Sequence, residues 1–247
     1  MKKGHRPSAP ASGRPRLWGK HAVTAALANP ERTIRHVWGT RDALAALDLP
    51  PVVPITRAEV ADLGRLVPND APHQGIVIEV DPLEDIWLGD LLEQGRDDRR
   101  PLLVLDQVTD PHNVGAMLRS AAAFDALGIV TQDRHSPPES GTVARAASGA
   151  LEFVPWVRVV NLARALDEIG EAGFWRIGLT GTAKKTLAET LGQTRPCLVM
   201  GAEGEGMRQN TEAHCDELAK LPISPRIESL NVSNAAAIAL YAAQVRG

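Results

Sequence analysis

The sequence predicts an α/β protein with a small module over residues 16–80 and a larger parallel-sheet domain over residues 101–247. Three observations predict this class. Short runs of Val, Ile and Leu alternate with helix-period patterns along both parts. Residues 81–100 are acidic and then mixed in charge, which is typical of a linker, here with one short helix. The 247 residues, 44% hydrophobic and 23% charged, suffice for one large or two modest globular domains.

The small module follows a tail, residues 1–15, whose Pro, Ser, Lys and Arg content predicts disorder. This basic tail is as compatible with an RNA-contacting arm as with a solubilising or cloning-derived extension. Thr56 and Glu59 have the spacing of a capping box at the start of the last helix. The expected elements are helix 19–30 ended by Asn29-Pro30, strand 34–40, helix 41–48, strand 52–56, helix 57–67 and strand 74–80.

The larger domain contains apolar runs separated by helical patterns, which predict a parallel sheet covered on both faces. Ligands of such sheets bind at the carboxyl ends of the strands. The loops after Asp106, Leu179, Met200 and Pro222 are therefore the candidate binding loops. The expected strands are 102–106, 128–131, 153–160, 175–179, 197–200 and 218–223.

Bulk properties argue against several classes. No apolar run approaches the roughly 20 residues that span a bilayer, and the N-terminus lacks the apolar part of a secretory signal. We therefore expect a cytoplasmic protein with no membrane partner. Cys197 and Cys215 lack metal-ligand spacing, so we expect free thiols and no metal site. The net charge of -3 means that nucleic-acid binding would need local basic surface.

The first candidate loop, residues 106–113, leads into an apolar helix that carries one permanently charged residue, Arg119. Asn113 is the expected N-cap of this helix. Val114, Leu118 and Ala121 form one apolar face. Arg119 lies beside that face, so it is either a surface arginine or one directed into a ligand cleft.

The second candidate loop, LVMGAEGEGM at residues 198–207, has Gly201, Gly204 and Gly206 after an apolar strand. Glycines in this pattern indicate left-handed backbone or a close approach. The spacing fits neither a nucleoside-triphosphate loop nor a dinucleotide fingerprint. Glu203 and Glu205 also disfavour a bound anion. The loop therefore suits a neutral or cationic ligand such as S-adenosylmethionine.

The third candidate loop, within residues 221–243, gathers polar side chains where an irregular segment becomes a helix of small residues. Ser229, Asn231 and Ser233 lie together there. Capping needs only one of them, so the surplus indicates binding. No Asp–His pattern accompanies the serines, which argues against a hydrolase triad.

These three loops, in this order, resemble the motifs of the SpoU (TrmH-like) family of RNA ribose 2′-O-methyltransferases. The matching segments are DPHNVGAMLRSAAAFD, LVMGAEGEGM and LPIS…SLNVSNAAAIALY. The small module, from WGKHAVTAAL to HQGIVIEV, is similar to the ribosomal-protein-L30-like, RNA substrate-binding domain of larger members. The resemblance implies a SPOUT-type α/β domain with a C-terminal deep trefoil knot and a homodimer formed through the knotted domain. Strand and helix patterns alone do not predict a knot.

The resemblance also implies S-adenosylmethionine as cofactor and assigns roles to residues. The cofactor-binding positions correspond to Gly201, Leu221 and Leu230, together with Thr180 and Gly181. The catalytic or RNA-contacting positions correspond to Asn113, Arg119, Glu203, Ser229 and Asn231.

The implied reaction is in-line transfer of a methyl group to a ribose 2′-hydroxyl, which requires an aligned oxygen and removal of its proton. A guanidinium is a poor base, so we expect Arg119 to bind a phosphate beside the target ribose and to stabilise the developing alkoxide. Proton acceptance by Arg119 itself, or by His112, stays open. We expect Asn113 and Ser229 to position the sugar, and Glu203 to orient Arg119 or Asn231.

The reaction that the resemblance implies requires an RNA and not a DNA substrate, because only RNA offers a 2′-hydroxyl. The two-domain arrangement resembles family members that methylate a guanosine of 23S ribosomal RNA, and a transfer-RNA ribose is the alternative. A ribosome-associated RNA-binding protein without catalysis is a second hypothesis, against which the third motif argues. The acidic glycine loop disfavours a dinucleotide-dependent oxidoreductase.

Overall fold

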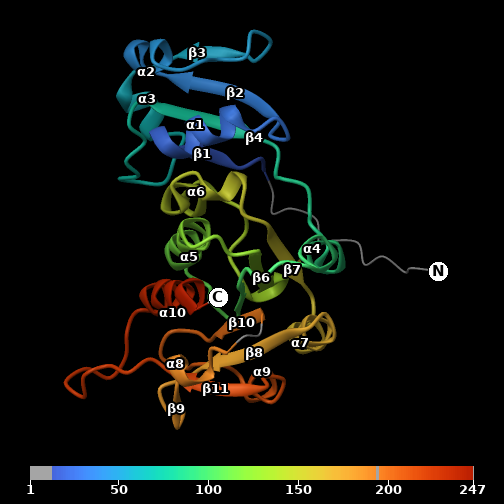
Figure 1. The fold of residues 1–247 in the computed structure, drawn as a ribbon. Coiled ribbons are helices and arrows are strands. Elements are labelled where there is room, and N and C mark those ends of the chain that lie inside the picture. Colours follow the sequence, from blue (N-terminus) through green and yellow to red (C-terminus); the bar gives the residue numbers. More distant parts are fainter. Residues whose placement is uncertain (1–12, 193–194, 247) are drawn as a thin grey trace.

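A computed structural model describes residues 13–192 and 195–246. The chain forms two sheets that lie one above the other in Figure 1, with helices between them. The smaller sheet has four strands in the order β1-β4-β2-β3, and the larger has seven in the order β7-β6-β5-β10-β8-β11-β9. Residues 1–12 of the expected tail lie outside the described residues. In the described part of the chain, no helix is long and apolar enough to span a bilayer.

The small module alternates strands and helices along residues 16–80. Its elements are β1 (Arg16–Trp18), α1 (Lys20–Ala28), β2 (Ile34–Gly39), α2 (Arg41–Ala45), β3 (Ile55–Arg57), α3 (Val60–Gly64) and β4 (Ile76–Val80). The expected end of the first helix is confirmed, since Asn29 is its C-cap and Pro30 follows. Strands β1 and β2 pair antiparallel with β4, while β3 pairs parallel with β2.

Two local predictions for this module are wrong. The strand expected at 52–56 begins only at Ile55, because the residues before it form a turn. The capping box of Thr56 and Glu59 does not form: Glu59 is itself the N-cap of α3, and its side chain makes no capping hydrogen bond. The Thr56 hydroxyl instead lies 2.8 Å from Nε2 of His36 on the neighbouring strand.

The seven-stranded sheet is parallel throughout, as the apolar runs predict. Its strands are β5 (Leu102–Leu105), β6 (Gly128–Gln132), β7 (Trp156–Val159), β8 (Phe174–Leu179), β9 (Lys185–Thr186), β10 (Arg195–Met200) and β11 (Glu217–Lys220). The two-residue strand β9 was not expected, and β7 is shorter than the predicted segment 153–160.

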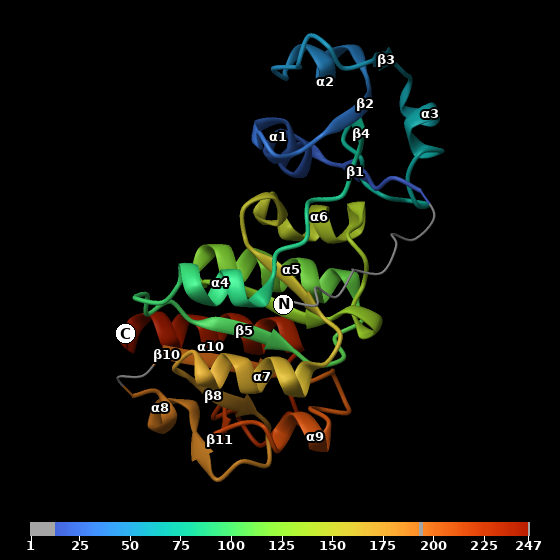
Figure 2. The same cartoon turned by 90° about the vertical axis from the view of Figure 1, so that its right-hand side faces the viewer.

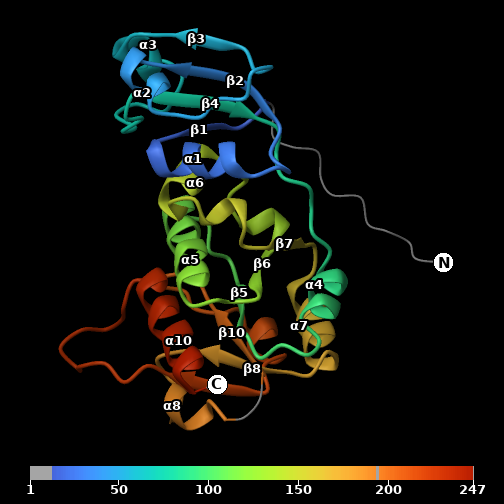
Figure 3. The ribbon, with the colours of Figure 1, turned by 45° about the horizontal axis from the view of Figure 1, so that its top comes forward.

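Helices cover both faces of this sheet, which is why its strands are apolar on both sides. One face packs against α5 (Pro111–Ala123), α8 (Leu187–Thr190) and α10 (Val232–Arg246), while α6 (Gly141–Ala147) packs on α5 and on β1 of the small module. The other packs against α4 (Leu88–Gln94) and α7 (Leu162–Glu171), with α9 (Gln209–Glu212) beside α7. Figure 3 shows α10 alongside α5 on its face and α4 with α7 on the opposite one.

The two units share one hydrophobic core. Buried side chains of α1, β2 and β4 belong to the same cluster as those of α5, α6 and α10. Helix α1 contacts both α6 and the 3-10 turn η2 (Ala150–Glu152). The helix α4 in the expected linker is itself packed, with Leu88, Leu91 and Leu92 buried in the second core cluster.

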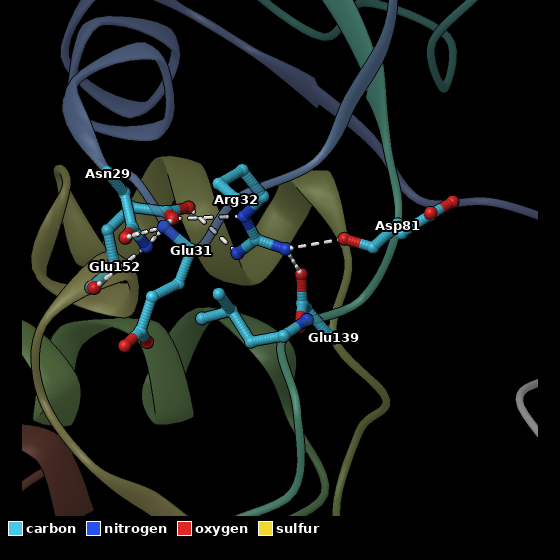
Figure 4. Close-up of polar contacts among 7 residues, drawn as sticks. Asn29, Glu31, Arg32, Asp81, Glu139 and Glu152 are labelled. Atoms are coloured by element: carbon cyan, nitrogen blue, oxygen red, sulfur yellow. Dashed lines mark hydrogen bonds and ion pairs between the residues drawn. The ribbon is translucent and has the colours of Figure 1, made fainter.

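A buried cluster of ion pairs connects the small module to the larger domain at the junction between them (Figure 4). The Arg32 side chain is 0% exposed and lies 2.8 Å from Glu152 and 2.5 Å from Glu139. It also donates to the Asp81 carbonyl oxygen, and Asn29 donates to the Glu152 carboxylate. Burial by itself would lower the pKa of Arg32, but the hydrogen bond and charge of Glu152 with the charge of Glu139 outweigh burial and raise it.

Both cysteines are free thiols, as expected. Burial raises the pKa of the Cys197 thiol well above its usual value, and burial also raises the pKa of Cys215 to about 12. Thiols of this kind are poor nucleophiles and poor metal ligands. Their environment is that of core side chains.

Candidate functional site

The carboxyl edge of the large sheet brings the candidate loops together. Strand pairing aligns Met200 of β10 with Leu105 of β5 on one side and with Leu179 of β8 on the other. Asp106, Gly201 and Thr180 therefore follow on three adjacent strands. Leu179 also pairs with Ala219 of β11, so Leu221 comes two residues beyond the same edge. The predicted location at the strand ends thus holds for residues from four separate stretches of chain.

The first loop differs from prediction in its cap. Helix α5 begins at Pro111, one turn earlier than expected, because Asp110 is the N-cap and its carboxylate accepts a hydrogen bond from the His112 backbone N–H. Asn113 is therefore not the cap but lies within the first turn. This placement frees its side chain for a contact outside the helix.

Asn113, Asn231 and Glu203 form one hydrogen-bonded cluster that joins all three loops. The Asn231 amide nitrogen donates to Asn113 Oδ1 at 3.1 Å and to Glu203 Oε2 at 3.2 Å. The side-chain Oδ1 of Asn231 accepts from the backbone N–H and the hydroxyl of Ser233, at 2.9 and 2.6 Å. Each loop thus contributes one polar group, and Asn231 is fixed on both sides.

The glycine loop forms a tight turn above β10. Ala202 and Gly206 exchange two backbone hydrogen bonds of 3.0 Å, and both Gly204 (φ 86°) and Gly206 (φ 73°) have left-handed backbone. Gly201 is needed for a different reason: a Cβ atom there would lie 2.1 Å from the Gly206 carbonyl carbon and 2.1 Å from the Met207 nitrogen. The prediction of left-handed backbone or a close approach is confirmed, and the loop contains both.

An ion pair between a buried carboxylate and a partly exposed arginine, at the ends of these loops, was not predicted. Asp106 is 0% exposed, and its carboxylate accepts hydrogen bonds from the Arg208 backbone N–H at 2.9 Å and side chain at 2.8 Å. Arg208 also donates to Gln132 at 2.8 Å. These bonds tie the end of the glycine loop to β5 and β6. The available signal was an aspartate directly after an apolar strand and an arginine after the glycines, which pattern alone does not pair.

The remaining predicted site residues are not in this cluster. Arg119 is exposed on α5 and has no hydrogen-bond or ion-pair partner within residues 13–192 and 195–246. Ser229 is exposed in the long segment between β11 and α10, which projects from the body of the molecule (Figure 1). Leu221 and Leu230 are half-buried, Gly181 is exposed, and the Thr180 backbone N–H donates to the Ala219 carbonyl oxygen at 2.9 Å.

Comparison with known proteins identifies the family to which this chain is similar. Residues 100–241 match the SpoU rRNA methylase family, and residues 16–86 match the model for RNA 2′-O ribose methyltransferase substrate binding.

The chain belongs to the SpoU rRNA methylase family.

The matches between this SpoU chain and its relatives extend over most of its length. It is 37% identical over 239 residues to the 23S rRNA (guanosine-2′-O-)-methyltransferase RlmB of Pseudomonas putida, covering 92% of this chain and 95% of that one. The RlmB of Ralstonia nicotianae is 40% identical over 237 residues, covering 92% and 94%. An uncharacterized tRNA/rRNA methyltransferase of Synechocystis is 39% identical over 235 residues; that match covers 91% of this chain and 61% of the relative.

Solved structures of two methyltransferases have the same fold. The methyltransferase AviRb of Streptomyces viridochromogenes, in complex with the cofactor AdoMet, superposes with a TM-score of 0.76 at 21% identity, covering 95% of this chain and 90% of that one. An AdoMet-bound rRNA methyltransferase of Sinorhizobium meliloti gives a TM-score of 0.76 at 21% identity, covering 93% and 86%. At this identity the likeness concerns the fold, and it agrees with the predicted α/β class.

Proposed function

We propose that this SpoU protein uses S-adenosylmethionine to methylate a ribose 2′-hydroxyl of a guanosine in 23S ribosomal RNA. The observation that carries the proposal is the cluster of Asn113, Asn231 and Glu203, in which all three family motifs meet at the carboxyl edge of the sheet. Near-full-length relatives named for this reaction support the substrate.

The cofactor site is proposed at the edge formed by Thr180, Gly181, Gly201, Leu221 and Leu230. Small or apolar residues predominate there, and a Cβ atom at Gly181 would lie more than 4 Å from every described residue other than its chain neighbours. Together with the carboxylates of the glycine loop, this lining fits a neutral adenosine and a cationic sulfonium better than an anion. S-adenosylmethionine supplies an electrophilic methyl group. The chain contributes a binding edge that holds the ligand in one orientation.

Gly201→Ala tests this cofactor edge. The added Cβ atom has to displace the backbone at Gly206 and Met207, so we expect S-adenosylmethionine binding to weaken at least about tenfold and stability to fall by about 1–3 kcal/mol. Gly64→Ala is the control, because that residue lies in α3 with no atom within 4 Å of an added Cβ. Calorimetric titration and thermal unfolding measure the two effects. Equal cofactor affinity in both variants would contradict the assigned edge.

The proposed chemistry divides roles among the chain's own residues. Arg119 is exposed and has no partner in the described part of the chain, so its planar fork is available to a substrate phosphate, where its charge stabilises the alkoxide that forms. Glu203 orients Asn231 through their hydrogen bond. Asn113 and Ser229 position the target ribose. In this scheme the hydroxyl proton is released to solvent as the oxygen attacks the methyl carbon, because the protonated guanidinium of Arg119 has no lone pair with which to accept it.

We propose further that the C-terminal part forms the deep trefoil knot of the family and dimerises through it. After β11 the chain returns to pack α10 on α5, β10 and α8, which come from three different stretches of sequence. Helix α10 leaves Ile238, Tyr241 and Val245 46–66% exposed on one side. Exposed apolar residues at this spacing support a second copy of the chain as partner. Equilibrium sedimentation of the Tyr241→Lys variant tests the dimer.

The domain limits proposed are a tail over 1–15, an L30-like RNA-binding domain over 16–80, a linker over 81–100 and the methyltransferase domain over 101–247. A ribosomal RNA substrate implies a cytoplasmic location. The competing functions are methylation of a transfer-RNA ribose and RNA binding without catalysis. Transfer of labelled methyl groups from S-adenosylmethionine to 23S ribosomal or transfer RNA transcripts separates all three: the proposal expects label only in the ribosomal transcript, in alkali-resistant dinucleotides.

A further inference from the structure

The four-stranded sheet has one face that is only partly covered. Figure 2 shows α1 and α3 on opposite sides of this sheet. Strand pairing places two rows of side chains across the α3 side. The first row is Arg16, Glu79 and His36; the second is Trp18, Val77, Trp38 and Thr56. Leu63 of α3 packs with Trp18 and Val77 of the second row, whereas the first row stays partly exposed.

His36 of the first row and Trp38 of the second row form an aromatic pair where the covered part of this sheet face meets the exposed part. The rings of His36 and Trp38 are stacked, with centroids 4.1 Å apart and planes 20° from parallel. The His36 ring is also held by its 2.8 Å hydrogen-bond contact with Thr56. The Arg16 guanidinium lies 5.6 Å from the Trp38 ring centroid. The two rings are thus fixed in orientation while both remain partly exposed.

We propose that His36, backed by Trp38, is a stacking subsite for an unpaired base of the RNA substrate, with Arg16 at the adjacent phosphate. The inference rests on the proposed function only in taking the ligand to be RNA. A fixed aromatic face extends a stack with any base, and an arginine beside it meets the backbone charge. The Arg16 guanidinium donates one hydrogen bond to the Leu66 carbonyl oxygen at 3.2 Å, which orients it, and its pairing with Glu79 at 3.6 Å is loose enough for exchange with a phosphate.

The surroundings favour a nucleic acid over an apolar partner. The open row consists of an arginine, a glutamate and a histidine, so an apolar segment docked there would remove the Arg16–Glu79 pair from water at a cost in desolvation. Both rows also lie within the stretch that matches the substrate-binding model, residues 16–86. Trp38 packs against the core cluster that includes Leu63 of α3, so its substitution would also affect stability, whereas His36 does not belong to that cluster. The test therefore uses His36.

Fluorescence anisotropy with a labelled single-stranded 12-nucleotide RNA and the full chain tests the subsite. We expect His36→Ala to weaken binding roughly tenfold and His36→Phe, which keeps a flat ring, to bind within about twofold of wild type. His21→Ala is the matched control: His21 is exposed on α1, on the opposite side of the same sheet, and its loss leaves binding unchanged. A fully paired RNA of equal length is expected to show little difference between the variants, because its bases are not available for stacking.

The inference is overturned if His36→Ala binds the single strand like wild type, or if His36→Phe binds as weakly as His36→Ala. Wild-type chain that binds no single strand also overturns it. Methyl transfer by the wild-type chain to a 23S transcript is measured in parallel. If the wild-type chain fails to methylate the transcript but His36→Ala still weakens RNA binding, the proposed function is contradicted and the stacking subsite is not.

Discussion

Arg119→Lys is expected to lower kcat for RNA methylation by roughly a hundredfold or more while leaving S-adenosylmethionine affinity unchanged. Lysine keeps the positive charge but loses the planar fork that would hold a phosphate at two oxygens. Loss of one donor to a developing oxyanion costs about 10²–10³ in rate. Single-turnover methylation of a 23S transcript measures the rate, and calorimetry measures cofactor affinity.

The control for this variant is Arg164→Lys. Arg164 is also exposed, but on α7, which covers the opposite face of the sheet from α5 and α10. It is expected to methylate at the wild-type rate. Wild-type turnover by Arg119→Lys would remove Arg119 from the proposed chemistry.

Arg32→Met is expected to lower the free energy of unfolding by about 3–5 kcal/mol. The substitution removes a fully buried cation and leaves Glu152, 4% exposed, and Glu139, 14% exposed, facing each other without their partner. Because the pair joins the small module to the larger domain, the loss would loosen the junction at which both units pack. Urea denaturation followed by circular dichroism measures the change.

Arg65→Met provides the comparison for this loss. Arg65 also forms an ion pair, with Asp62 at 2.8 Å, but its side chain is 79% exposed. Solvent screens such a pair, so we expect a change of about 0–1 kcal/mol. Similar losses in the two variants would mean that the Arg32 cluster does not stabilise the junction beyond an ordinary surface pair.

Local chemistry explains which parts of the fold could be predicted. The helix ended by Asn29-Pro30 and the apolar strands of the large sheet depend on propensity and periodicity, which the sequence displays directly. The Thr56 and Glu59 prediction was wrong because tertiary contact competes with capping: Thr56 interacts with His36 across the sheet. The short strand β9 exists only because β11 lies beside it.

The same distinction applies to the site. The special backbone of the glycine loop was predictable because only glycine adopts such geometry without strain. The prediction of Asn113 as N-cap was wrong because Asp110 followed by Pro111 is the stronger helix start. The pairs Arg32–Glu152 and Asp106–Arg208 join residues 120 and 102 positions apart, and such partners are set by the packing of whole elements. Periodicity contains no information on them.

The most direct test of the proposed function is to map 2′-O-methyl groups in ribosomal and transfer RNA from a strain that lacks this gene. We predict that one guanosine of 23S ribosomal RNA loses its methyl group, that the wild-type gene restores it, and that the Arg119→Ala gene does not. Intact methylation of 23S ribosomal RNA in the deletion strain, or loss of methylation at a transfer-RNA ribose instead, would contradict the proposed function.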